Sequence, residues 1–184
     1  MSSRSPFKLG ASAPRSGDSI AAAVTSIRRL VRVLRLNAQR TQAIAGISSA
    51  QLFVLQQLGT DDSLSLNELA ARTLTDRSSV AAIVDRLALQ GLVDRAADLS
   101  DRRRASVRIT TKGRRMLLRA PEAPTTALVA ALRQLTPRER QALARSLARL
   151  NGAMGAADEP ATMLFADADE TRGTRRKIGR SKRR

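Results

Sequence analysis

The side chains best suited to chemistry in this sequence are arginines and lysines gathered in one short stretch. Residues 95 to 119 hold nine basic residues against Asp98 and Asp101, a net charge of +7. Charge this dense on a protein surface repels itself unless an anion lies against it. The stretch therefore predicts a surface that binds a polyanion, with nucleic acid as the first candidate and an anionic membrane surface as the second.

The chain as a whole is also basic, and it lacks the usual catalytic residue types. Its 184 residues include 33 Lys and Arg against 16 Asp and Glu, a net charge of +17, with no Cys and no His. These absences exclude disulfides, thiol nucleophiles, Ser-His-Asp triads and most transition-metal sites. We therefore expect no metal, no cofactor and no enzyme activity. A hard-metal site at Asp61 and Asp62 is the weak alternative, because this pair suits a solvated loop after Gly59.

The segment 77–90 is predicted to be a helix with one apolar face and one small, polar face. At 100° per residue, Val80, Ile83, Val84 and Leu87 fall on the inward side. The opposite side carries Ser78, Ala82 and Asp85, flanked by Ser79, Ala81 and Arg86, and Arg77 is the long donor of the first turn. Small side chains let a helix approach DNA closely, since serines can bond bases or phosphates and alanine methyls can touch thymine methyls.

Helix signals occupy most of residues 18–159. A long amphipathic helix is expected over 19–45, with an apolar stripe of Ile20, Val24, Ile27, Val31 and Leu34. Capping patterns predict three shorter helices, from Ser48 to about Gly59, from Ser65 to about Thr73 and from Thr136 to about Met154. A start signal at Thr75-Asp76 predicts a fourth helix, which ends near Gly91. Two β-prone stretches, 92–95 and 105–110, predict a hairpin with a long basic tip. Further helix is expected over 112–119 and 125–135, interrupted by Pro121 and Pro124.

The two ends differ from this helical region. Residues 1–17 have the composition of a disordered basic arm, and 160–184 that of a disordered basic tail whose last fourteen positions hold eight basic residues and no acid. No apolar run is long enough for a membrane span or a signal peptide. We expect no membrane partner and a cytoplasmic, nucleoid-associated protein.

A short helix, a tight connection, a longer helix and a basic hairpin follow the order of a winged helix-turn-helix. The residues also resemble the MarR-type transcriptional regulators. The resemblance is densest at Val84-Asp85-Arg86-Leu87, Gln90 to Arg95, Asp101 to Arg104 and Arg108 to Gly113. It implies a mainly α fold with a small β-hairpin wing, which dimerises through N- and C-terminal helices at about 19–45 and 112–154.

The resemblance also implies roles for residues of the wing. Arg103 is similar to the family's minor-groove arginine, and Asp101 to the acid that orients it, while Arg102 and Arg104 are expected on phosphates. Arg86 is expected to brace the wing or to contact a phosphate, with a plain surface role as the alternative. Ala81 and Ala82 stand where the family often places a hydroxyl residue and a larger polar or basic residue. Three Phe with no Trp or Tyr leave little to stack on a phenolic effector.

Together these features predict a regulator, we expect a repressor, that binds a pseudo-palindromic operator in double-stranded DNA. Homodimerisation is expected because the terminal helices would otherwise expose apolar stripes, including Leu143, Leu147 and Leu150. The alternative is a nucleoid-type architectural protein with little sequence preference. Whether a small-molecule effector exists stays open.

Overall fold

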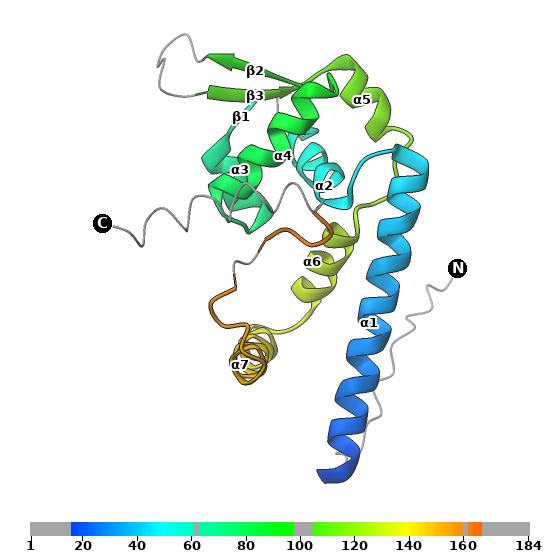
Figure 1. Ribbon diagram of the computed structural model, residues 1–184, viewed down its shortest axis with the longest axis vertical. Coiled ribbons are helices and arrows are strands. Elements are labelled where there is room, and N and C mark those ends of the chain that lie inside the picture. Colours follow the sequence, from blue (N-terminus) through cyan, green and yellow to red (C-terminus); the bar gives the residue numbers. More distant parts are fainter. Residues whose placement is uncertain (1–15, 61–62, 98–104, 160–161, 167–184) are drawn as a thin grey trace, which may run out of the picture. The chain divides into compact units, whose positions relative to one another are not determined.

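The computed structural model describes residues 16–60, 63–97, 105–159 and 162–166 (Figure 1). The chain divides into two units, residues 1–35 and 36–184, and each is described by itself. The elements follow in the order α1 (Ser16–Ala45), α2 (Ser49–Leu58), β1 (Leu64–Ser65), α3 (Leu66–Thr73), α4 (Arg77–Leu89), β2 (Val93–Ala97), β3 (Ala105–Ile109), α5 (Thr111–Leu117), α6 (Pro124–Gln134) and α7 (Pro137–Ala153).

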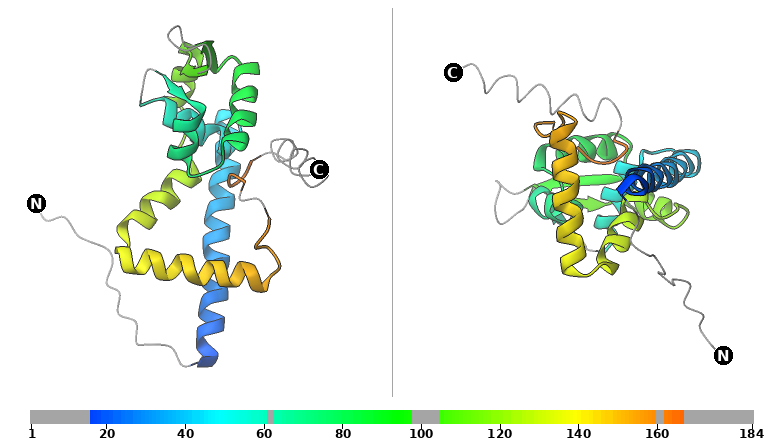
Figure 2. Two further views of the ribbon diagram at one scale, coloured as in Figure 1. Left: turned by 90° about the vertical axis from the view of Figure 1, so that its left-hand side faces the viewer. Right: turned by 90° about the horizontal axis from the view of Figure 1, so that it is seen from below.

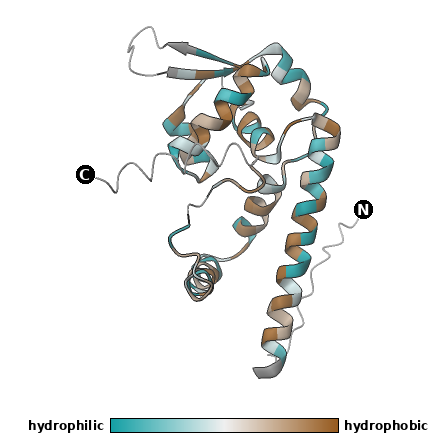
Figure 3. Cartoon of the chain, in the orientation of Figure 1, coloured by the Kyte–Doolittle hydropathy of each residue, from teal (hydrophilic) through white to brown (hydrophobic). Residues whose placement is uncertain are grey.

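Helix α1 is the predicted long amphipathic helix. Hydrophobic and hydrophilic residues alternate along it, as expected from the spacing of its apolar residues (Figure 3). It begins at Ser16, three residues before the predicted start, and so takes in the last two residues of the predicted N-terminal arm. Asp18 lies in its first turn, where a carboxylate is favoured by the helix dipole.

Three helices begin at the capping boxes that the sequence predicts. The Ser48 hydroxyl accepts from the Gln51 backbone N–H at 3.1 Å, and Gln51 Oε1 accepts from the Ser48 N–H at 2.9 Å. The same reciprocal pair joins Ser65 to Glu68 at the start of α3, and Thr136 to Glu139 at the start of α7. Each box satisfies two backbone donors that a helix start leaves unpaired, which fixes where the helix begins.

Helix α4 packs the predicted apolar face into the core and ends at the predicted glycine. Val80, Ile83, Val84 and Leu87 are all buried. Gly91 has φ +68°, a conformation that costs glycine little, and the Leu92 N–H donates to the Leu87 carbonyl at 2.9 Å. This turn sends the chain from α4 directly into β2.

The sheet has three antiparallel strands in the order β1-β3-β2. Val93 pairs with Ile109 and Ala97 with Ala105, which confirms the predicted hairpin. The third strand, β1, is not predicted by the sequence. It pairs Leu64 with Val107 and Ser65 with Ser106, and a strand of two residues carries too little pattern to be recognised when its partner is distant in the chain.

The core lies among α2, α3, α4 and the sheet. Its largest fully buried side chains include Leu52, Leu55, Leu58, Leu69, Ile83, Leu87 and Leu92. Met163 also belongs to this cluster, at 8% exposure, and Ala166 packs against it. Residues 162–166 therefore pack on the core, which corrects the prediction of a tail beginning at residue 160. Met163 begins a short apolar run, Met163-Leu164-Phe165, which is too short to show a helical or strand period, so the sequence does not indicate this contact.

Gln56 of α2 holds the proline-containing turn between α5 and α6. Its Nε2 donates to the Pro121 carbonyl at 3.2 Å, and its Oε1 accepts from the Ala123 N–H at 3.3 Å and the Thr126 hydroxyl at 3.0 Å. Pro124 occupies the first turn of α6, where its missing N–H is harmless. The predicted interruption is thus confirmed, and it is held in place by α2.

Beyond this turn α6 leads away from the cluster of α2 to α5, and α7 runs crosswise at its far end (Figure 2, left). Helix α7 has no buried residue in this single chain. Its apolar stripe is therefore uncovered within the chain.

Candidate nucleic-acid interface

The exposed side of α4 carries the residues that the sequence assigns to DNA. Arg77, Ser78 and Asp85 are exposed, while Ala81, Ala82 and Arg86 are half-buried. Ser79 differs from the prediction: it is 5% exposed, because its side chain turns back toward the helix start. The surface of the first turn therefore consists of Arg77 and Ser78, followed by the two alanines.

Asp76 organises this first turn. Its Oδ1 accepts from the Ser79 backbone N–H at 2.9 Å and from the Ser78 hydroxyl at 2.5 Å, and its Oδ2 accepts from the Ser79 hydroxyl at 2.6 Å. Partial burial alone would raise the pKa of Asp76, but these hydrogen bonds outweigh it and lower the pKa to about 2. The cap is therefore an ionised carboxylate that holds both serine hydroxyls. The sequence indicates a helix start here, but not this use of the serines.

An ion pair joins the wing to α4. Arg95 of β2 lies with its Nη2 2.6 Å from Asp85 Oδ1, and the same nitrogen donates to the Ala81 carbonyl at 3.3 Å. The Arg95 side chain is 37% exposed and that of Asp85 is 59% exposed, so water screens the pair. It links β2 of the wing directly to α4. Asp85 and Arg95 stand in the motifs of the resemblance, but their pairing depends on the fold.

The base of the wing is tied to the end of α4 by two further bonds. The Thr110 hydroxyl donates to the Gly91 carbonyl at 2.8 Å, and Lys112 Nζ donates to the Gln90 carbonyl at 2.7 Å. The Gln90 carbonyl belongs to the C-cap of α4 and is one that a helix end leaves unpaired. The basic residues Arg108 and Arg114 are exposed nearby on β3 and α5.

The predicted wing-tip residues Asp101, Arg102, Arg103 and Arg104 lie outside the described residues. Asp61 and Asp62, the weak alternative for a hard metal, lie outside them as well. Within the part of the chain that the structure describes, no group of three or more acidic side chains could hold a metal ion. The described part also contains no helix long and apolar enough to cross a membrane.

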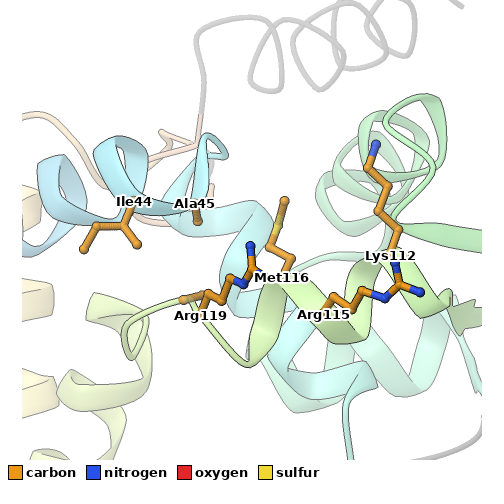
Figure 4. Close-up of a pocket in the computed structure, with 7 residues that line it drawn as sticks. Ile44, Ala45, Lys112, Arg115, Met116 and Arg119 are labelled. Carbon is orange, nitrogen blue, oxygen red and sulfur yellow. The ribbon is translucent and has the colours of Figure 1, made fainter.

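A shallow pocket of about 380 Å³ opens between the end of α1 and α5 (Figure 4). It is lined by Ile44, Ala45, Lys112, Arg115, Met116, Arg119 and Ala120. The lining combines aliphatic side chains with three cations and contains no aromatic residue, in keeping with the low aromatic content of the chain. Such a lining suits a small anion with an aliphatic body.

The residues predicted for dimerisation are exposed in the single chain. On α1, the exposed fractions are 72% for Ile20, 39% for Val24, 44% for Ile27 and 37% for Val31. On α7, they are 37% for Leu143, 45% for Leu147 and 41% for Leu150. Side chains of this type at such exposure leave two apolar stripes in contact with water.

Comparison with known proteins agrees with this geometry. Residues 45–104 match the family model described as MarR family. The HTH-type transcriptional regulator TtmR of Methylorubrum extorquens (strain PA1) is 33% identical over 100 residues, which cover 54% of this chain and 50% of that protein. The HTH-type transcriptional repressor MdtR of Bacillus subtilis (strain 168) is 37% identical over 68 residues, 37% of this chain and 44% of that protein.

The chain therefore spans about half the length of the curated relatives that it matches. Among solved structures, a MepR-like protein complexed with pseudoligands superposes with a TM-score of 0.50 at 25% identity, over 74% of this chain and 94% of that chain. The stretch that matches the family model contains α2, α3, α4 and β2, which carry the arrangement described above.

Proposed function

We propose that the chain is a winged helix-turn-helix protein of the MarR family and a transcriptional regulator that binds double-stranded DNA. The observation that carries the proposal is the surface of α4, where Arg77 and Ser78 are exposed ahead of two half-buried alanines. A helix with small side chains in its first turns can enter the major groove, and basic wing residues can follow the phosphate backbone beside it. The Arg95–Asp85 ion pair supports the proposal, because it links β2 of the wing directly to α4.

We further propose that the protein acts as a repressor on a pseudo-palindromic operator. The match to MdtR, which is named as a repressor, supports this direction of control. Arg103 is proposed to enter the minor groove with Asp101 as its orienting partner, and Arg102 and Arg104 are proposed to contact phosphates. Arg86 is proposed to lie beside the wing or a phosphate.

A homodimer is part of this proposal. The exposed stripes on α1 and α7 need a cover, and a second copy presents the same stripes to them. A two-fold dimer places two α4 helices against successive major grooves, so its half-sites are expected about one helical turn apart.

A nucleoid-type architectural role is the second candidate. Ala81 and Ala82 favour it, because methyl groups distinguish bases weakly, and so does the run of eight basic residues after Glu170. Both candidates bind DNA, and they differ in how much they discriminate between sequences.

Selection from a library of random duplexes with the full chain, followed by competition, separates the two candidates. A regulator keeps the selected duplex against a large excess of random DNA at physiological salt, since specific binding exceeds nonspecific binding by about 10³-fold or more. If random DNA displaces the selected duplex at equal mass, the architectural role replaces the proposed one. If neither DNA binds, both candidates are wrong.

A small-molecule effector is a further proposed partner, and the pocket between α1 and α5 is the place we propose for it. Arg115 and Arg119 would face the anionic group of such a ligand. A panel of small aliphatic carboxylates, tested by thermal shift on the full chain and on Arg119→Glu, checks this. Ligands that stabilise both proteins equally would place the site elsewhere.

A further inference from the structure

The hydroxyl of Ser78 is an exposed polar group on α4, directly after Arg77. Its proton is already used in a hydrogen bond within the protein. It donates to Asp76 Oδ1 at 2.5 Å, a short distance for a hydroxyl bonded to a carboxylate. Asp76 stays ionised at neutral pH, because its pKa is about 2. A hydrogen bond of this kind is roughly twice as strong as one between neutral groups, so it persists beside a ligand.

A serine hydroxyl has one proton and two acceptor lone pairs. With the proton held by Asp76, the oxygen of Ser78 can accept hydrogen bonds but cannot donate one. It is therefore unsuited to phosphate oxygens, to guanine N7 and O6, and to thymine O4, all of which need a donor. It is suited to the two donors of the major groove, the N6 amino group of adenine and the N4 amino group of cytosine.

The neighbouring groups point the same way. Ser79 cannot substitute as a donor, because it is buried and its own hydroxyl donates to Asp76 Oδ2 at 2.6 Å. The ionised carboxylate also repels phosphates around the helix start. Arg77 is thus the donor of the first turn, and Ser78 is the acceptor beside it.

We propose that Ser78 is a specificity-determining residue that accepts a hydrogen bond from an exocyclic amino group, so that one operator position must carry adenine or cytosine on the strand facing α4. The inference rests on the proposed function, since it concerns how the same surface distinguishes bases. It goes beyond that function because it states which group donates and which accepts in one contact with a base.

The experiment compares selection profiles from random duplexes for the full wild-type chain and for Ser78→Ala. The change removes the acceptor but leaves the cap bond between Asp76 and the Ser79 backbone intact. At the position contacted by Ser78, the wild type is expected to prefer A or C over G or T by about fivefold to tenfold, the scale of a single base contact. In Ser78→Ala this preference is lost, and the other positions keep theirs.

A second variant tests the role of the carboxylate. Asp76→Ser keeps an N-cap hydroxyl, so the helix start is retained, but it removes the anion that holds the Ser78 proton. Ser78 can then donate as well as accept. The same position is expected to tolerate G and T in this variant, while total affinity for the selected duplex stays within about threefold. Ser26→Ala is the matched control, because it removes a serine hydroxyl from α1, where Ser26 donates to the Ala22 carbonyl.

Base analogues test whether Ser78 contacts the exocyclic amino group of the base. Replacing the preferred adenine by 2-aminopurine, or the preferred cytosine by pyrimidin-2-one, removes the amino group from the major groove. This should weaken wild-type binding about as much as Ser78→Ala does, and should weaken Ser78→Ala no further, as in a double-mutant cycle.

The outcomes are distinguishable. If selection returns no enriched sequence for the wild type, the proposed sequence-specific function fails. If a sequence is enriched but Ser78→Ala leaves every position unchanged, or if the position that changes prefers G or T, the role of Ser78 is refuted while the regulator function stands. An unchanged selection profile in Asp76→Ser would show that the Asp76 carboxylate does not restrict Ser78 to accepting hydrogen bonds.

Discussion

Gly113 lies where helix α5 crosses the base of the wing, and the space there excludes a methyl group. A Cβ at this position would lie 2.3 Å from the Leu92 carbonyl oxygen, 2.7 Å from Ile109 Cγ1 and 3.3 Å from the Leu92 carbonyl carbon. The Leu92 oxygen is backbone, and it accepts from the Thr110 N–H at 3.1 Å. Relief of the clash would therefore disturb the junction of β2, β3 and α5.

The expected cost of Gly113→Ala follows from these contacts. Forcing an extra methyl into a packed site costs about 1–3 kcal/mol. The intrinsic preference of a helix for alanine over glycine returns about 0.5–1 kcal/mol. Because the clash is with a backbone atom that cannot swing aside, the upper end of the first range, about 3 kcal/mol, applies. After the helix preference is subtracted, we expect a net loss of about 2 kcal/mol in the free energy of unfolding.

Gly152→Ala is the matched control. Gly152 also lies in a helix, α7, but a Cβ there meets no atom within 4 Å. It lies nine residues from Leu143, on the opposite side of the helix from the apolar stripe. The same chemical change should therefore raise the free energy of unfolding by about 0.5–1 kcal/mol.

Urea unfolding of the full chain, followed by circular dichroism at one fixed protein concentration, measures both variants. The two changes should shift stability in opposite directions. A Gly113→Ala protein as stable as the wild type, or more stable, would show that the junction yields without cost, and the argument from packing would be refuted.

Four further predictions concern oligomerisation, the tail, the wing and pH. Leu147→Asp should turn the proposed dimer into a monomer in light scattering and abolish binding to the selected duplex, and a wild type that is monomeric at micromolar concentration would contradict this. Deleting 171–184 should flatten the salt dependence of DNA affinity without changing the ranking of sequences, because fewer counterions are released; an unchanged slope would mean that the tail does not touch DNA. Arg103→Ala should weaken specific binding by about 1–3 kcal/mol, and Asp101→Ala should also weaken it. The double variant should bind hardly worse than Arg103→Ala alone, whereas tighter binding by Asp101→Ala would refute the orienting role. Because hydrogen bonding lowers the pKa of Asp76 from 3.8 to about 2, the stability that it adds over Asp76→Asn should be complete above about pH 5 and fall as the pH drops toward 2; a difference independent of pH in urea titrations would contradict this.

Much of the helical framework follows from local sequence alone. The capping boxes at Ser48, Ser65 and Thr136, the stop at Gly91 and the inward face of 77–90 all involve residues that are near neighbours in the chain. Such interactions need no distant partner, so periodicity and capping chemistry locate the helices to within a few residues. The strong basic charge favours a polyanionic partner, and the lack of Cys and His excludes most catalytic chemistry, because both follow from residue types alone.

The tertiary structure decided which side chains meet. Strand β1 forms because Leu64 reaches Val107, and Gln56 holds a turn 65 residues away. Met163 packs in the core, although the apolar run Met163-Leu164-Phe165 is too short to predict this contact. These contacts depend on how elements pack, which sequence spacing alone does not specify.

The candidate site divides in the same way. Sequence spacing places Arg77, Ser78 and Asp85 on the exposed part of a helix. Only the folded chain commits the serine hydroxyls to Asp76 and pairs Asp85 with Arg95 of the neighbouring strand. A hydrogen bond depends on side-chain rotamers, distances and approach angles, and these are fixed by packing around the first turn of α4 rather than by the order of residues within it.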